Sequence, residues 1–210
     1  DPTTPLRDIV HPRGLQIIGE SESYFGWSVS SAGDVNNDGY DDIIVGAKST
    51  TVRSRSRAGS AYIIFGKDVG QIPSAISLPL SDPHVCVQLD GAAAGDAFGW
   101  SVSGAGDVNN DGYDDIIVGA PNASLSGIIS AGSTYVIYGR SNFPAEIDMN
   151  GLDPADGFFM NGENSGDMSG YSVGGGADVN QDGISDIIIG APRARNGVHT
   201  LTGIDRKSVV

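Results

Sequence analysis

The chain has 210 residues, with 12 lysines and arginines against 26 aspartates and glutamates, and its formal net charge is −14. This charge argues against binding to nucleic acid or to anionic membrane surfaces, whose phosphates it would repel, and it favours bound cations. The 31 glycines and 10 prolines fall short of the share seen in disordered chains, no apolar run is long enough to insert into a membrane, and the single cysteine excludes an internal disulfide.

The predicted elements are short β-strands separated by glycine, proline and polar turns. In chain order they are expected at 27–35, 43–45, 61–65, 85–89, 134–138 and 158–160. The first alternates small and apolar residues around glycine, as in a strand confined to a tight space. The Ile43-Ile44-Val45 run is typical of a strand buried on both faces. No window holds a sustained apolar period of 3.6 residues, so no substantial helix is predicted.

The strand pattern belongs to an internal repeat. The segment 33–47 returns unchanged at 106–120, and a looser copy occupies 177–191. About four strands in a unit of roughly 70 residues predicts the blades of a β-propeller, whose inner strands are covered on both faces and crowd against the axis. A β-sandwich with duplicated halves is the weaker alternative, because sandwich halves rarely keep whole loops identical.

Each repeat carries an acidic turn between its first two strands. Positions 1, 3, 5 and 9 of this turn are aspartate or asparagine in every copy, and position 6 is a glycine, which lets the chain turn sharply. Alternate residues of a tightly curled loop can aim their oxygens at one centre, and the variable seventh residue is expected to supply its backbone carbonyl. The predicted ligands of the three loops are Asp34, Asn36, Asp38, Tyr40 and Asp42; Asp107, Asn109, Asp111, Tyr113 and Asp115; and Asp178, Asn180, Asp182, Ile184 and Asp186.

The ligand type indicates which ion these loops would bind. Three carboxylates and one amide oxygen are hard ligands that suit Ca²⁺, whereas Zn²⁺ prefers histidine or cysteine and Mg²⁺ rarely uses an all-protein cage. An EF-hand is rejected because position 12 is apolar in each copy (Val45, Val118 and Ile189) instead of a glutamate. The remaining alternative is a metal-free Asp-Gly hairpin turn, which the retention of every ligand position in three copies makes less favourable. Three Ca²⁺ sites are therefore predicted.

The repeat resembles the FG-GAP repeat of integrin alpha-chain propellers and their bacterial relatives. The resemblance covers about residues 15–204 and is carried by Phe25-Gly26 with Gly46-Ala47-Lys48, by Phe98-Gly99 with Gly119-Ala120-Pro121, and by Ser169-Gly170 with Gly190-Ala191-Pro192. Lys48 replaces the proline of the motif in the first repeat, and Ser169 replaces its phenylalanine in the third. Both are packing positions, so neither departure affects the metal assignment.

The resemblance implies an all-β fold of four-stranded antiparallel blades in a seven-bladed propeller, of which this chain holds about three. Repeats are then expected at 15–86, 87–157 and 158–204, the third being incomplete. An N-terminal tail (1–14) precedes them, and residues 205–210, which match nothing in the repeat, are expected to be a non-native tail.

The resemblance further implies calcium loops on the lower face and ligand binding on the opposite face, by segments 48–57, 91–97, 121–130 and 162–167. Arg53, Arg55 and Arg57 stand out in the first of these, because the matching loop of the second repeat is uncharged. They are candidate contacts for an anion or an acidic partner, and the alternative is an ordinary solvated loop. The partner expected on this face is a protein or a glycan.

These features favour a non-catalytic, calcium-stabilised module for cell adhesion or protein recognition, in an extracellular or cell-surface protein resembling integrin alpha chains. No catalytic residue is predicted, because His11, His84 and His199 do not recur with the repeat. The alternative function is an accessory or glycan-binding propeller of a larger secreted enzyme. Exposed aromatic residues would favour glycan binding, but Trp27 and Trp100 are expected in the core.

Overall fold

The computed structural model of the chain describes residues 14–68, 70–71, 75–79, 82–125 and 127–194, together with the backbone of 204–208. Every regular element in these residues is a β-strand, as predicted. The strands are β1 (Gln16–Ile18), β2 (Phe25–Gly33), β3 (Asp42–Ala47), β4 (Ser60–Ile64), β5 (Ala75–Ser77), β6 (Cys86–Asp90), β7 (Ser101–Gly106), β8 (Asp115–Ala120), β9 (Ser133–Ile137), β10 (Glu146–Asp148), β11 (Gly157–Asn161), β12 (Ser172–Ala177), β13 (Asp186–Ala191) and β14 (Ile204–Ser208).

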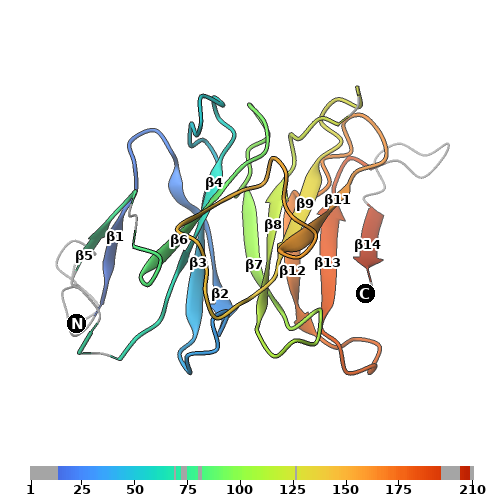
Figure 1. Ribbon diagram of the computed structural model, residues 1–210. Helices are drawn as coiled ribbons and strands as arrows, with labels where there is room; N and C mark the ends of the chain where they lie inside the picture. The colour runs from blue at the N-terminus through green and yellow to red at the C-terminus, as the bar shows by residue number, and fades with distance from the viewer. Residues whose placement is uncertain are drawn as a thin grey trace, which may run out of the picture.

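The strands form antiparallel sheets that stand side by side, as Figure 1 shows. The first sheet contains β2, β3, β4 and β6 in this order, the second β7, β8, β9 and β11, and the third β12, β13 and β14. The first strands β2, β7 and β12 lie against one another from sheet to sheet. Antiparallel sheets whose first strands pack against one another in this way are the blades of a propeller. The predicted all-β partial propeller is therefore confirmed.

In each of the first two blades, the connector between the third and fourth strands contains a short strand that pairs with the edge of another strand. β10 extends the first sheet by pairing in parallel with β6, with Ile147 opposite Leu89. β5 pairs in the same way with β1, with Ile76 opposite Ile17. The repeat boundaries expected at 86/87 and 157/158 fall within β6 and β11, the fourth strands of their sheets, so each blade extends past the end of its sequence repeat.

The backbone of residues 204–208 forms β14, which pairs antiparallel with β13 so that Arg206 lies opposite Ile189. β14 occupies the place beside the second strand that β4 and β9 hold in the other blades. Residues 205–208 of the segment expected to be a non-native tail thus belong to a strand of the third blade. Within the described residues this blade has three strands.

The apolar second strands form the core between the blades. In β8, Ile116 and Val118 belong to the cluster shared with the first blade, and Ile117 belongs to the cluster shared with the third. Because successive strand residues point to opposite faces, β8 is buried on both sides, as predicted. The same prediction, made for the run 43–45, is wrong at Ile43 in the identical β3: Ile43 is 41% exposed, because the outer face of this blade is covered only in part, by a cluster that includes residues of β1 and β5. Cys86 lies buried in that outer cluster.

Neighbouring blades touch through the backbone at one glycine in the second strand of the first blade and at one in the second strand of the second blade. A Cβ atom on Gly46 would lie 2.0 Å from the carbonyl oxygen of Gly99, and a Cβ atom on Gly119 would lie 2.0 Å from that of Gly170. In each case a serine hydroxyl from the first strand also donates to this carbonyl, at 2.9 Å and 2.8 Å. Only glycine permits this approach, so the two glycines set the distance between adjacent blades.

Candidate functional site

The three acidic loops lie at the same end of the sheets, at the bottom of Figure 1. Each loop connects the first strand of a blade to the second, and together they span 34–41, 107–114 and 178–185. The sixth residue of each loop is a glycine with a φ near +90° (Gly39, Gly112 and Gly183), and an added Cβ there would meet nothing within 4 Å. Glycine is therefore required at this position by the left-handed backbone and not by lack of space.

The first loop draws three of its predicted ligands together. The backbone N–H of Asp38 donates to Asp34 Oδ1 at 2.9 Å and to Asn36 Oδ1 at 3.0 Å. The N–H of Gly39 donates to Asp34 Oδ2 at 2.8 Å, and the N–H of Tyr40 donates to Asp38 Oδ1 at 3.0 Å. The Asn36 amide donates to Asp38 Oδ2 at 2.9 Å. The same bonds recur in the second and third loops, so the side chains of positions 1, 3 and 5 are drawn together by hydrogen bonds in all three.

The aspartate at position 9 has a different environment. Asp42 is buried and accepts backbone N–H groups from Val35 at 2.9 Å and from Gly66 at 2.8 Å. Asp115 accepts two equivalent bonds, both at 2.8 Å, and Asp186 accepts one at 2.7 Å. Burial raises the pKa of Asp42 and of Asp115 to about 7, although the backbone hydrogen bonds act in the opposite direction. These carboxyl groups therefore anchor the loop to the strands that follow it.

The donor set of each loop fits a hard divalent cation such as Ca²⁺. Within the residues that the structure describes, no three His, Cys, Asp or Glu side chains gather into one metal cluster. The convergent set is two carboxylates and an amide, and the carboxylate at position 9 is engaged by backbone N–H groups. A carboxylate or amide oxygen that accepts one hydrogen bond keeps a second lone pair, so every predicted side-chain ligand retains a free lone pair that can coordinate an ion. The charges of Asp38 and Asp34 also raise the pKa of Asp42, which is the repulsion that a cation would offset.

Contacts between successive loops were not apparent from the sequence. Asp114, the eighth residue of the second loop, accepts the N–H of Asp34 through its Oδ2 atom at 2.9 Å. Its own N–H donates to the Asp34 carbonyl at 3.4 Å, and Ser185 of the third loop donates to the Asp107 carbonyl at the same distance. The eighth residue therefore faces the start of the preceding loop. The only signal in the sequence was a polar residue at a position with no predicted role in ion binding.

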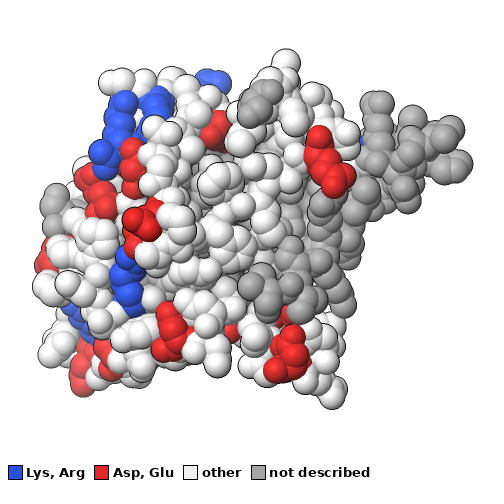
Figure 2. Space-filling model, turned by 45° about the vertical axis from the view of Figure 1, so that its right-hand side comes forward, with Lys and Arg blue, Asp and Glu red and all other residues white. Residues whose placement is uncertain are grey.

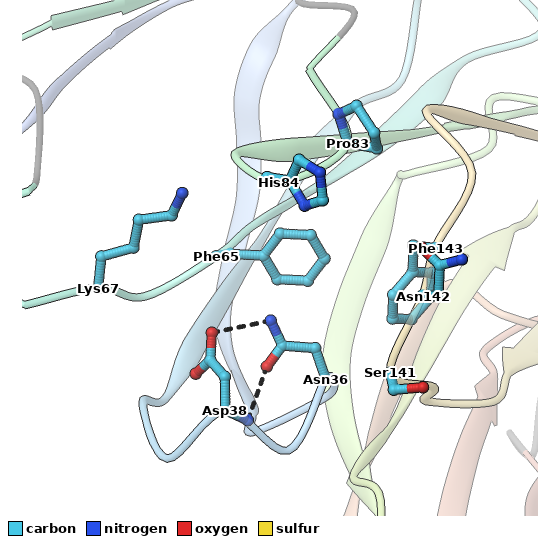
Figure 3. Close-up of a pocket in the computed structure, with 9 residues that line it drawn as sticks. All are labelled: Asn36, Asp38, Phe65, Lys67, Pro83, His84, Ser141, Asn142 and Phe143. Atoms are coloured by element: carbon cyan, nitrogen blue, oxygen red, sulfur yellow. Dashed lines mark hydrogen bonds between the residues drawn. The ribbon is translucent and has the colours of Figure 1, made fainter.

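A polar cavity of about 200 Å³ adjoins the first loop, as Figure 3 shows. Asn36 and Asp38 reach it from the loop, and the rings of Phe65 and Phe143, from the first and second repeats, lie 5.8 Å apart beside it. His84 lies on this cavity, whereas His11 and His199 lie outside the described residues. The full lining is Asn36, Asp38, Phe65, Lys67, Pro83, His84, Ser141, Asn142 and Phe143.

The three arginines of the opposite face differ in their contacts. Arg53 pairs with the buried Asp90 at 3.1 Å, and Arg55 pairs with Asp148 at 2.8 Å. These pairs tie the loop between β3 and β4 to β6 and β10, so both guanidinium groups stabilise the junction of the first two repeats. Arg57 has no carboxylate within 4.0 Å among the described residues and lines an open cavity. Of the three candidate ligand contacts, Arg57 is the one that remains available.

A row of aromatic side chains crosses the end of the blades opposite the acidic loops. Ring centroids are 6.3 Å apart for Tyr24 and Trp27, 5.3 Å for Trp27 and Trp100, and 5.3 Å for Trp100 and Tyr171. The Nζ atom of Lys48 lies 3.4 Å from the Trp27 centroid. The prediction that Trp27 and Trp100 belong to the core is wrong, because Trp27 is 47% exposed and Trp100 is only partly buried and lies outside the buried core. The missed signal was the recurrence of an aromatic residue after the same glycine in all three repeats.

Three segments of the chain, 25–64, 98–137 and 169–202, match the family model described as FG-GAP repeat. Phosphatidylinositol-glycan-specific phospholipase D of Bos taurus is 31% identical over 193 residues, which are 92% of this chain and 22% of that protein. Integrin alpha-6 of Gallus gallus is 32% identical over 173 residues, 80% of this chain and 13% of that protein. Integrin alpha-PS5 of Drosophila melanogaster is 33% identical over 173 residues, 81% of this chain and 15% of that protein.

The chain spans less than a quarter of the length of these curated relatives. The matched part is a repeat module and not a catalytic domain. Among the described residues, no helix has the length and apolar character needed to cross a membrane.

Proposed function

This chain belongs to the FG-GAP repeat family, and from that premise we propose that it is a calcium-binding recognition module of an extracellular or cell-surface protein, with no catalytic activity of its own. The observation that carries the proposal is that the same hydrogen bonds draw the side chains of positions 1, 3 and 5 together in three loops at one end of the blades. A role in adhesion or protein recognition is supported by the integrin alpha chains among the relatives.

The residues that would hold each ion are the side chains at positions 1, 3, 5 and 9 of a loop, with the backbone carbonyl at position 7. A bound ion supplies positive charge among three carboxylates, whose repulsion costs about 1–4 kcal/mol per pair in its absence. At a hundredfold excess over the dissociation constant, one filled site stabilises the fold by about 2.7 kcal/mol. Three filled loops would thus contribute about 8 kcal/mol, which is comparable to the whole stability of an ordinary domain.

A second candidate is an accessory or glycan-binding propeller of a larger secreted enzyme. The phospholipase D of Bos taurus supports it, because this relative is named as an enzyme and the chain covers only 22% of it. Three exposed members of the aromatic row, Tyr24, Trp27 and Tyr171, support the glycan-binding form of the same candidate, since aromatic faces are suited to stack on sugar rings. Both candidates share the calcium loops and differ only in the partner of the opposite face.

The test is calcium titration by calorimetry together with thermal unfolding in calcium and in chelator. Three ions per chain and a lower melting temperature in chelator are expected. Asp34→Ala should reduce the stoichiometry by one ion, whereas Asp41→Ala removes an adjacent exposed carboxylate that is not a predicted ligand and should leave it unchanged. Equal melting temperatures after verified removal of calcium, or no calcium uptake at all, would overturn the proposal.

A further inference from the structure

Basic side chains gather on the face of the molecule that carries the loop between β3 and β4, at the upper left of Figure 2. They are unusual in a chain of net charge −14. Arg53 and Arg55 in this group form ion pairs with Asp90 and Asp148, respectively. Lys48 and Arg57 have no carboxylate within 4.0 Å among the described residues, so their positive charges remain uncompensated.

The two uncompensated cations line the same cavity. Its volume is about 360 Å³, within the range of ligand pockets. Besides the cations it presents hydroxyl groups from four residues, one aromatic face and one carboxylate. The lining is Glu22, Tyr24, Lys48, Ser49, Thr51, Ser56 and Arg57.

The cavity opens beside the aromatic row. Tyr24 belongs to both, and it is 57% exposed, so its ring is available for stacking. Lys48 is held in place by the same row, since its Nζ atom lies 5.1 Å from the Tyr24 centroid and 3.4 Å from that of Trp27. A cation over aromatic faces keeps its full charge, so Lys48 is positioned without being neutralised.

We propose that this cavity binds an acidic saccharide, with the acidic group between Lys48 and Arg57 and a sugar ring stacked on Tyr24. The inference rests on the proposed recognition function and names the ligand class of its opposite face. The hydroxyl groups of Ser49, Thr51 and Ser56 and the Glu22 carboxylate match the many hydroxyl groups of a sugar. An acidic peptide could use the two cations, but it lacks the many hydroxyl groups that would pair with Glu22 and with the serine and threonine hydroxyls. Further sugar units would lie along Trp27, Trp100 and Tyr171.

The second repeat supplies a matched set of variants. Its residues at the positions of Tyr24, Lys48 and Arg57 are alanine, proline and serine. The backbone at the first and third of these positions is left-handed in both repeats, with φ of 55° and 58° for Tyr24 and Ala97. Tyr24→Ala and Arg57→Ser therefore place in the first repeat side chains that the second repeat carries on a left-handed backbone at the same positions, and Lys48→Pro introduces the residue that the second repeat has there. Lys67→Gln removes one charge at the other end of the blades and serves as the control.

The experiment is calorimetric titration of the whole chain in excess calcium with trigalacturonate, its neutral methyl ester, a heparin-derived tetrasaccharide and a pentaglutamate peptide. One or both acidic saccharides should bind, and which one does so distinguishes a carboxylate from a sulfate ligand. Each of the three variants should weaken this binding by about tenfold or more, and Lys67→Gln should leave it unchanged.

Four results would overturn the inference: no binding of either acidic saccharide, equal binding of the methyl ester, binding of the peptide alone, or binding unaffected by the three variants. Calcium-dependent melting measured on the same samples separates this outcome from failure of the proposed function. If the chain melts at a higher temperature in calcium but does not bind acidic saccharides, the proposed calcium binding stands and only the saccharide inference is wrong.

Discussion

The contact between blades at Gly119 leads to a sharp prediction for Gly119→Ala. The added Cβ would lie 2.0 Å from the Gly170 carbonyl oxygen and 2.4 Å from Ser101 Oγ, whereas Cβ contacts under 3.0 Å essentially do not occur. The second and third blades must therefore separate locally by about 1 Å. Overpacking of this kind costs about 1–3 kcal/mol, and loss of the Ser101 hydrogen bond adds about 1 kcal/mol. We expect Gly119→Ala to lower the free energy of unfolding by about 2–4 kcal/mol.

The third blade provides the matched control. At Gly190, the equivalent position, the nearest atom to an added Cβ is the hydroxyl oxygen of Ser172, which can rotate away, and no carbonyl of another blade lies within 3.4 Å. Alanine is also favoured over glycine in a strand by about 0.5–1 kcal/mol, so Gly190→Ala should be close to neutral.

The assay is thermal and urea unfolding in excess calcium, followed by circular dichroism. The expected loss at Gly119 corresponds to a fall in melting temperature of roughly 4–16 °C for a chain of this size. Ser101→Ala, which removes only the hydrogen bond, should account for the smaller part of this effect. Equal effects of alanine at 119 and 190, or no effect at 119, would refute the view that this glycine sets the spacing of the blades.

Two further predictions concern Arg53 and Asp96, which are charged residues on the face opposite the acidic loops. Arg53→Met leaves the buried Asp90 without its cation and should cost about 1–2 kcal/mol in urea unfolding, whereas Arg57→Met should be near neutral; equal costs would contradict the pairing. Burial raises the pKa of Asp96 to about 6, so its contribution to stability is full below the usual carboxyl pKa near 4 and is lost as the pH rises through about 6. Asp96→Asn should therefore gain stability relative to the parent chain between about pH 4 and pH 7, and a difference that does not change with pH would count against this burial.

The blades were predictable because their information is local and repeated. The Ile-Ile-Val runs, the acidic turns and the bounding glycines predicted the first three strands of each complete blade, and segments 85–89 and 158–160 located the fourth. The repeat boundaries were set by sequence similarity, which does not record that the fourth strand pairs with the sheet before it. The exposure of Ile43 could not be predicted from the sequence either, because the same segment is buried or exposed according to whether a neighbouring blade covers it.

In the candidate sites, too, features within one loop could be predicted from the sequence, whereas contacts between distant segments could not. The hydrogen bonds that join positions 1, 3 and 5 lie within one loop, where the spacing of the residues can be read from the sequence, and ion binding by these residues stays a prediction. The partners of Arg53 and Arg55 come from a different strand and a different repeat, and no local pattern identifies such pairs. The aromatic row likewise exists only because three blades bring Trp27, Trp100 and Tyr171 to one edge.

The carbonyl–glycine contact joins unlike sides of successive blades, which makes each junction head-to-tail. The second blade therefore presents a glycine (Gly119) on one side and a receiving carbonyl (Gly99) on the other. A blade inserted by tandem duplication of its coding segment would arrive with both halves of the contact already matched to its neighbours. The identity of 33–47 and 106–120 is the result expected from such a duplication, since a copied blade needs no new contact surface.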